Sequence, residues 1–209
     1  MTAGPKPGVL DWARRVQAIA QTGLTFTRDP FDRVRYEQLQ QLVSSILAST
    51  LDLTESQAGA LWANETGYAT PKVDTRGGVF DGDRVLLVRE RSDGKWCLPG
   101  GWVDVNDSPS SAVEREIREE SGYIAKAVKL AAVFDRNRHP HTPSVYHIWK
   151  LFFVCERTGG TATASDETDA VEFFPVHSLP ELSTGRVTAG QIQRLYEHRL
   201  RPELPTDFD

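Results

Sequence analysis

The sequence has little cysteine. Cys97 and Cys155 are the only two among 209 residues, and no CxxC pair occurs. Two thiols this far apart provide neither a disulfide framework nor a zinc site, so we expect small buried or half-buried side chains. So few cysteines also fit a reducing compartment. Because the N-terminal stretch lacks an apolar signal core, we expect a cytoplasmic protein.

Positive charge and long apolar runs are scarce as well. Lys and Arg number 24 against 29 Asp and Glu, which leaves a net charge of −5. An acidic chain lacks the broad basic face of sequence-independent DNA binding, so we expect no stable nucleic-acid partner. No apolar run approaches the roughly 18–20 residues that a membrane-spanning helix needs, so no membrane partner is expected. Hydrophobic residues still make up 39% of the chain, which suffices for a packed core.

The first 66 residues are predicted to form a small helical domain. Apolar residues recur there at spacings of three and four, as one buried helix face requires. This pattern predicts helices over 10–20, 30–47 and 54–64, with a break at Thr22–Gly23 and a helix start at Asp29–Pro30. A helical piece of this size is marginal alone. Two roles stay open: a dimerisation arm, which we favour and which predicts a homodimer, or a lid over the active site.

Strands dominate the predicted second domain, residues 67–209. Strands are expected over 73–80, 84–89, 128–134, 145–156 and 171–174, with helices over 108–121 and 189–200. Strand runs with helices between and after them predict an α/β or α+β sandwich.

The helix expected over 108–121 has clear start and stop signals. The preceding Leu98–Gly101 must be a loop, because proline and paired glycines favour unusual backbone angles. Ser108 suits the N-cap and Pro109 the first helical position. Gly122 suits the left-handed residue that ends a helix. A glycine loop therefore leads into this helix.

The same helix carries a cluster of carboxylates. Glu116, Glu119 and Glu120 lie three and four residues apart, so they project over one arc at the edge of the apolar face. Like charges at this spacing oppose the helix, and half-buried carboxylates without cations are costly. A divalent metal removes the repulsion, and oxygen-only ligands suit Mg²⁺ or Mn²⁺. The alternative is a solvated acidic face with Glu–Arg pairs, such as Glu114 with Arg118.

This segment resembles the Nudix hydrolase signature, GX5EX7REUXEEXGU. Gly101 is followed by five residues and Asp107, then by seven residues and Arg115-Glu116-Ile117-Arg118-Glu119-Glu120-Ser121-Gly122-Tyr123. The spacing is met throughout. Asp107 replaces the usual glutamate, and Tyr123 replaces an aliphatic residue. The resemblance implies an α/β/α sandwich with a mixed sheet for the second domain.

The resemblance also implies the roles of individual residues. Glu116, Glu119 and Glu120 bind one or more Mg²⁺ (or Mn²⁺) ions, with the carbonyl of Gly100 as a further ligand. One of these glutamates, or another from a later loop, deprotonates the attacking water. Glu167 is the expected residue of that loop, with a solvated acidic side chain as the alternative.

Likeness outside the signature extends over nearly the whole chain. The runs 17–24, 71–77, 94–102 and 138–141 resemble the CDP-choline pyrophosphatase and ADP-ribose pyrophosphatase-like branch, which has an N-terminal helical domain. This implies hydrolysis of the pyrophosphate bond of a nucleoside diphosphate linked to another group. CDP-choline, giving CMP and phosphocholine, is the favoured substrate. ADP-ribose, a nucleotide sugar, an RNA 3′ end as a side activity, or a non-catalytic nucleotide sensor are the alternatives.

Further side chains are candidates for substrate contact. They are Arg76, Arg89, His139 and His141. The arginines suit phosphate or ribose, with a solvated strand arginine as the alternative. The histidines flank a proline in a turn and suit the polar head or proton transfer, although such a pair is more often structural. Trp96 and Trp102 bracket the glycine loop, where one stacks on a base or both pack in the core.

Overall fold

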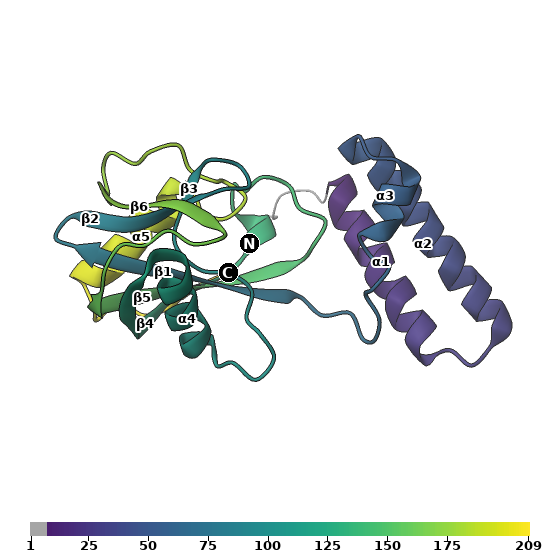
Figure 1. Ribbon diagram of the computed structural model, residues 1–209. Helices are drawn as coiled ribbons and strands as arrows, with labels where there is room; N and C mark the ends of the chain where they lie inside the picture. The colour runs from purple at the N-terminus through teal and green to yellow at the C-terminus, as the bar shows by residue number, and fades with distance from the viewer. Residues whose placement is uncertain (1–7) are drawn as a thin grey trace. The chain divides into compact units, whose positions relative to one another are not determined.

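The structure, a computed structural model, describes residues 8–209. The chain forms two compact units (Figure 1). The helical unit runs up to Pro71 and also includes Ser144–His147, and the strand-rich unit comprises Lys72–Pro143 and Ile148–Asp209. Within residues 8–209, no helix combines the length and apolar character needed to cross a membrane.

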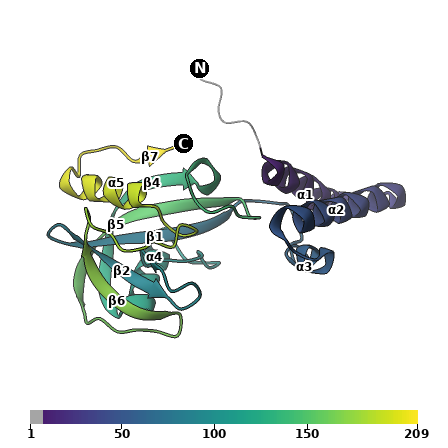
Figure 2. The same ribbon diagram turned by 90° about the horizontal axis from the view of Figure 1, so that it is seen from above.

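The helical unit contains α1 (Val9–Phe26), α2 (Pro30–Leu51) and α3 (Glu55–Ala60). The first two lie side by side (Figures 1 and 2). A small core of Ala13, Val43, Leu47 and Ala58 joins all three helices. The expected start of α2 is confirmed, because the Asp29 side chain accepts hydrogen bonds from the first-turn amides and Pro30 follows it.

Three expectations for this unit are wrong. The third helix was expected over 54–64 but ends at Ala60, and a turn follows it. The first helix does not break at Gly23 but continues to Phe26. Glycine is needed there for packing, since a Cβ atom at Gly23 would lie 2.4 Å from the Tyr36 ring of α2. The strand expected from 145 begins only at 148. Tyr146 instead packs edge-on against Trp62, with ring centroids 5.5 Å apart.

The strand-rich unit has seven strands and two main helices. The strands are β1 (Lys72–Asp81), β2 (Arg84–Glu90), β3 (Trp96–Cys97), β4 (Tyr123–Asp135), β5 (Ile148–Gly160), β6 (Thr168–Pro175) and β7 (Asp207–Phe208). The helices are α4 (Pro109–Ser121) and α5 (Ala189–Leu200), with a short 3-10 turn η1 (Arg136–Arg138). The order is β3-β2-β1-β5-β4-β7, and β6 pairs with β2. Because β1 and β5 are parallel while β4 and β5 are antiparallel, the expected mixed sheet is confirmed.

Alternating side chains place a core on each face of the sheet. Val79 and Phe153 face α4, where Val113 and Ile117 pack on them. Their neighbours Phe80 and Phe152 belong to the core on the other face, with Ile192 and Leu195 of α5. Figure 2 shows α5 running along that face. The expected α/β/α sandwich is therefore confirmed, and both cysteines are buried.

The glycine loop lies beside β1 as an extra strand-like segment. The Gly77 amide donates to the Pro99 carbonyl (2.9 Å), and the Thr75 amide donates to the Gly101 carbonyl (2.8 Å). Gly100 between them has a φ of 142°, and a Cβ there would lie 2.0 Å from the Thr75 oxygen. Only glycine fits at this position. The loop is thereby fixed between β1 and α4.

Candidate active site

Local signals in the sequence position α4 as expected. The Ser108 hydroxyl accepts a hydrogen bond from the Ser111 amide at 3.1 Å. Gly122 ends the helix in the left-handed region, with a φ of 73°. Val113 and Ile117 anchor one face against the sheet. The acidic arc consequently lies along the edge of α4 that borders the glycine loop.

Glu120 is the most deeply placed acid of this arc. Glu120 is only 5% exposed. Its Oε2 accepts a hydrogen bond from the Gly100 amide at 2.9 Å. Burial raises the pKa of Glu120 to about 8, although Arg76 and the Gly100 amide act in the opposite direction. A cation that binds beside a buried carboxylate such as this one stabilises its ionised form.

Glu116 and Glu119 both contact Arg115, and Glu116 also lies against the glycine loop. The Glu116 carboxylate lies against Gly101, where a Cβ would be 3.2 Å from Oε2, and burial raises its pKa. Arg115 Nη1 lies 2.9 Å from Glu116 Oε1 and 3.0 Å from Glu119 Oε2, so Arg115 pairs with both carboxylates. Asp107 accepts a hydrogen bond from Arg115 Nε at 3.3 Å. The substituted carboxylate therefore helps to orient this arginine.

The Glu114–Arg118 pair expected of a plain solvated helix face is not formed. Glu114 pairs instead with Lys126, at 2.9 Å. The remaining acids are turned toward the loop or toward Arg115. Lys126 lies on β4, so this acid pairs away from the loop.

The donor chemistry of this edge fits a divalent cation. Glu116 and Glu120 supply carboxylate oxygens beside Gly100 and Gly101, which is the oxygen-only set that Mg²⁺ and Mn²⁺ prefer. Within residues 8–209, no three His, Cys, Asp or Glu side chains already converge on one point. Glu119 is the most exposed member of the arc, and it pairs with both Arg115 and Arg118.

A buried ionic cluster lies on β1 and β5 behind the loop. Asp74 accepts from Arg76 Nη2 at 2.9 Å and from Lys150 Nζ at 2.7 Å. Arg76 Nη1 also donates to the Leu98 carbonyl at 3.1 Å. Burial alone would raise the pKa of Asp74, but the two cations outweigh it and hold that pKa below its usual value. Arg76 is thus neither solvated nor pendant, and its contact with substrate stays a prediction.

The loop before β6 connects Glu167 to the acidic edge. The Thr168 hydroxyl donates to the Glu120 carbonyl at 2.6 Å. The Glu167 carbonyl accepts from the Arg91 amide at 2.9 Å, and its side chain is exposed. Arg89 on β2 pairs with Asp169 at 2.7 Å. The structure therefore gathers Glu167 beside the C-terminal end of α4, and Arg89 beside the loop that carries Glu167.

The two candidate histidines have fixed protein partners. His139 Nε2 lies 3.1 Å from Asp209 Oδ1, and its ring packs on Phe134. His141 Nδ1 lies 2.8 Å from the Thr184 carbonyl, and Nε2 lies 3.0 Å from the Gln191 amide nitrogen. A carbonyl can only accept, so Nδ1 carries the proton and Nε2 accepts. Both side chains are engaged in the fold, and their contact with substrate stays a prediction.

The sequence reasoning missed Asp74, Lys150 and Thr168. A lysine within the apolar run of β5 was the available signal, since a buried charge requires a partner. Its partner is set by the parallel register that pairs Asp74 with Lys150. That register cannot be obtained from local periodicity.

Comparison with protein families matches both parts of the chain. Residues 7–62 match a family described as a UDP-X-like, N-terminal oligomerisation domain. Residues 71–195 match the NUDIX domain family.

Individual relatives cover much or nearly all of the chain. A Bacillus subtilis protein, YjhB, provisionally named an ADP-ribose pyrophosphatase, is 42% identical over 200 residues, which are 96% of each chain. A crystal structure of a UDP-X diphosphatase has a TM-score of 0.63 and 35% identity, and covers 96% of this chain and 98% of that chain. A Streptococcus suis ADP-ribose pyrophosphatase structure has a TM-score of 0.62 and 38% identity, over 67% of this chain and all of that one.

Proposed function

The chain belongs to the NUDIX family and is a Nudix pyrophosphohydrolase, and we propose that it cleaves a nucleoside diphosphate linked to a small polar group, with CDP-choline foremost. The supporting observation is the pairing of a buried acid with the glycine loop. Glu120 accepts a hydrogen bond from the Gly100 amide at 2.9 Å, while the Glu116 carboxylate lies against Gly101. Two carboxylates and a loop backbone thereby face one edge of α4.

The proposed metal ligands are Glu116, Glu119, Glu120 and the Gly100 carbonyl. A bound Mg²⁺ or Mn²⁺ ion would neutralise pyrophosphate charge and lower the pKa of a coordinated water. The flanking Pro99 and Gly101 carbonyls both accept from β1. Gly100 is therefore the loop residue whose backbone faces α4, which supports its assignment.

Glu167 is the proposed general base. Its backbone is held by the Ser165 hydroxyl at 3.2 Å and by Arg91, so its carboxylate extends from an anchored loop. The bond from Thr168 to the Glu120 carbonyl supports the proximity that proton abstraction requires. Arg89, Arg76, His139 and His141 remain the proposed substrate contacts.

CDP-choline and ADP-ribose are the two substrates to separate. The UDP-X diphosphatase that resembles nearly the whole chain is named for a uridine nucleotide, and cytosine is likewise a pyrimidine. This favours a pyrimidine nucleotide such as CDP-choline. ADP-ribose is the second candidate because the Bacillus subtilis relative is provisionally named for it.

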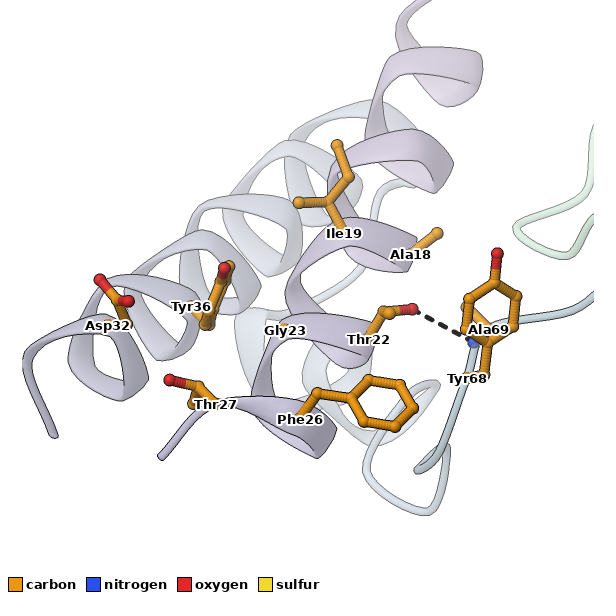
Figure 3. Close-up of a pocket in the computed structure, with 10 residues that line it drawn as sticks. All are labelled: Ala18, Ile19, Thr22, Gly23, Phe26, Thr27, Asp32, Tyr36, Tyr68 and Ala69. Atoms are coloured by element: carbon orange, nitrogen blue, oxygen red, sulfur yellow. Dashed lines mark hydrogen bonds between the residues drawn. The ribbon is translucent and has the colours of Figure 1, made fainter. Parts of the chain in front are cut away.

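We also propose that the helical unit joins two chains in a homodimer. It carries a run of exposed large apolar side chains, among them Trp12 (58%), Ile19 (59%), Phe26 (66%) and Tyr68 (70%). Some of them line a groove of about 660 Å³ along α1 (Figure 3). The Thr22 hydroxyl accepts from the Ala69 amide at 3.3 Å and fixes one wall. Apolar surface gathered this way is typical of an interface.

A product screen by mass spectrometry tests the proposed reaction. The protein is incubated with Mg²⁺ or Mn²⁺ and with CDP-choline, ADP-ribose, UDP-sugars or a short RNA. We expect CMP and phosphocholine from CDP-choline, at a kcat/KM about tenfold or more above that for ADP-ribose. AMP and ribose 5-phosphate as the dominant products would replace CDP-choline with ADP-ribose. Absence of cleavage in every case would contradict the proposed function.

A further inference from the structure

Trp102 is a large exposed aromatic residue directly after the glycine loop. It is 48% exposed, whereas Asp74, its partner on β1, is only 6% exposed. It forms an antiparallel bridge with Asp74 of β1. The flanking bonds run from the Thr75 amide to Gly101 and from the Val103 amide to Val73. That pattern makes Trp102 and Asp74 a non-hydrogen-bonded pair, whose side chains lie close together on one face.

The same face carries the buried ionic cluster. Asp74 is also opposite Lys150 in the parallel pairing of β1 with β5. Arg76, two residues along β1, points to this face as well. Trp102, Asp74 and Lys150 therefore form a row across three adjacent segments. Arg76 and Lys150 are two cations against the one carboxylate of Asp74, so this buried ionic cluster carries a net positive charge on the face that holds the Trp102 ring.

The two tryptophans that bracket the loop differ in their surroundings. Trp96 packs edge-on against Phe174, with centroids 4.6 Å apart, and Arg89 lies 5.8 Å from its ring centroid. Trp102 makes no ring contact, no cation contact and no indole hydrogen bond with any other residue in the 8–209 range. Trp96 is thus part of the packed structure, and Trp102 has a ring face available.

We propose that Trp102 stacks on the nucleobase of the substrate, and that the buried, positively charged cluster of Asp74, Arg76 and Lys150 on the same face attracts the adjoining phosphate electrostatically. An aromatic ring next to buried cations matches the two chemical parts of a nucleotide, a planar base and an anion. This assignment rests on the proposed function, in that the substrate is a nucleotide. It makes Trp102 a substrate-binding residue that recognises the base.

The test compares the binding of CMP and ribose 5-phosphate, which share the ribose and the 5′-phosphate but carry cytosine and a hydroxyl, respectively, at C1′. Isothermal titration calorimetry measures both ligands, without turnover, on the full chain and on Trp102→Leu and Trp102→Phe. We expect Trp102→Leu to weaken CMP binding by about 5- to 150-fold, as the loss of one stacked base predicts. Trp102→Phe keeps a ring and stays within a few-fold of the wild type. Ribose 5-phosphate binds all variants alike.

Trp149→Leu is the matched control. Trp149 is 47% exposed in the same sheet, but it pairs with Val73 and so lies on the opposite face. We expect this variant to bind CMP like the wild type. An equal loss of CMP in Trp149→Leu, or an equal loss of ribose 5-phosphate in Trp102→Leu, would overturn the assignment, as would unchanged CMP binding in Trp102→Leu.

The binding test is separable from the proposed reaction. A wild-type chain that binds CMP through Trp102 but does not cleave CDP-choline contradicts the substrate and leaves the stacking intact. A chain that cleaves CDP-choline with base-independent binding contradicts the stacking alone. A wild-type chain that binds neither ligand overturns the role of Trp102.

Discussion

Two glutamates on α4 show how surroundings divide one residue type into different roles. For Glu114, burial would raise the pKa, but Lys126 and the Ala127 amide outweigh it and the pKa is lowered. Among residues 8–209, no lysine or arginine forms an ion pair with Glu120, and burial raises the pKa of Glu120 to about 8. The first is a structural ion pair, while the second is a candidate ligand.

His141 provides a pH-dependent prediction. Burial lowers its pKa from 6.5 to about 4 in the folded chain. Between these values the unfolded chain binds more protons, so His141 makes the protein less stable as the pH falls. The unfolding free energy of the wild type therefore falls as the pH is lowered, and we expect this fall to be about 1 kcal/mol smaller in His141→Gln, after allowance for the partial exposure of the side chain. Urea unfolding at several pH values measures the difference, and equal pH slopes in both proteins would contradict it.

The glycine loop is the element on which the candidate site depends. Gly100 and Gly94 both have positive φ values, 142° and 69°. A Cβ atom added at Gly100 would lie 2.0 Å from the Thr75 oxygen, whereas a Cβ atom added at Gly94 would have no neighbouring atom within 4 Å. Gly100 is required both by its positive φ and by the close contact with the β1 backbone, whereas Gly94 is required only by its positive φ.

We therefore expect alanine to act differently at these two glycines. Gly94→Ala should cost about 1 kcal/mol of unfolding free energy, the usual penalty for a left-handed residue, and leave activity intact. Gly100→Ala should cost about 3 kcal/mol or more and abolish turnover, because the loop must leave β1. Chemical denaturation and a hydrolysis assay measure both effects. Similar costs at both positions would show that the loop tolerates displacement.

Elements with local signals were predictable from the sequence. The Ser108 cap, Pro109 and Gly122 fixed the bounds of α4, and α5 matches its expected range. Gly23 misled because glycine serves packing between helices there, not chain reversal. The short β3 and β7 carry too few residues for a periodicity and were missed.

The candidate site was predictable only in part, for a similar reason. The spacing of Glu116, Glu119 and Glu120 places them on one arc of any helix. The turn of Glu119 toward Arg115 is a choice of rotamer, and the Asp74–Lys150 pair depends on strand register. Neither follows from local sequence. The inclusion of Ser144–His147 in the helical unit is likewise a long-range effect.

The assembled protein is predicted to be a dimer through its helical unit. Sedimentation velocity should give a dimer for the full chain and a largely monomeric species for Ile19→Asp, which introduces charge into the exposed apolar groove. Val128→Asp is the control, since Val128 is similarly exposed (52%) but lies on β4. Removal of residues 1–66 should give a monomer or an aggregate. A monomeric full chain would contradict the dimer and favour a lid.

The decisive measurement is Mg²⁺-dependent hydrolysis by Glu120→Gln beside Glu114→Gln. A glutamine at position 120 can still accept a hydrogen bond from the Gly100 amide, so we expect both variants to fold. Circular dichroism checks this. We predict that Glu120→Gln loses about 10²-fold or more of kcat, because metal binding supplies several kcal/mol of charge stabilisation, while Glu114→Gln stays within a few-fold of the wild type. Wild-type turnover by a folded Glu120→Gln variant would contradict the assignment of this acid to the metal.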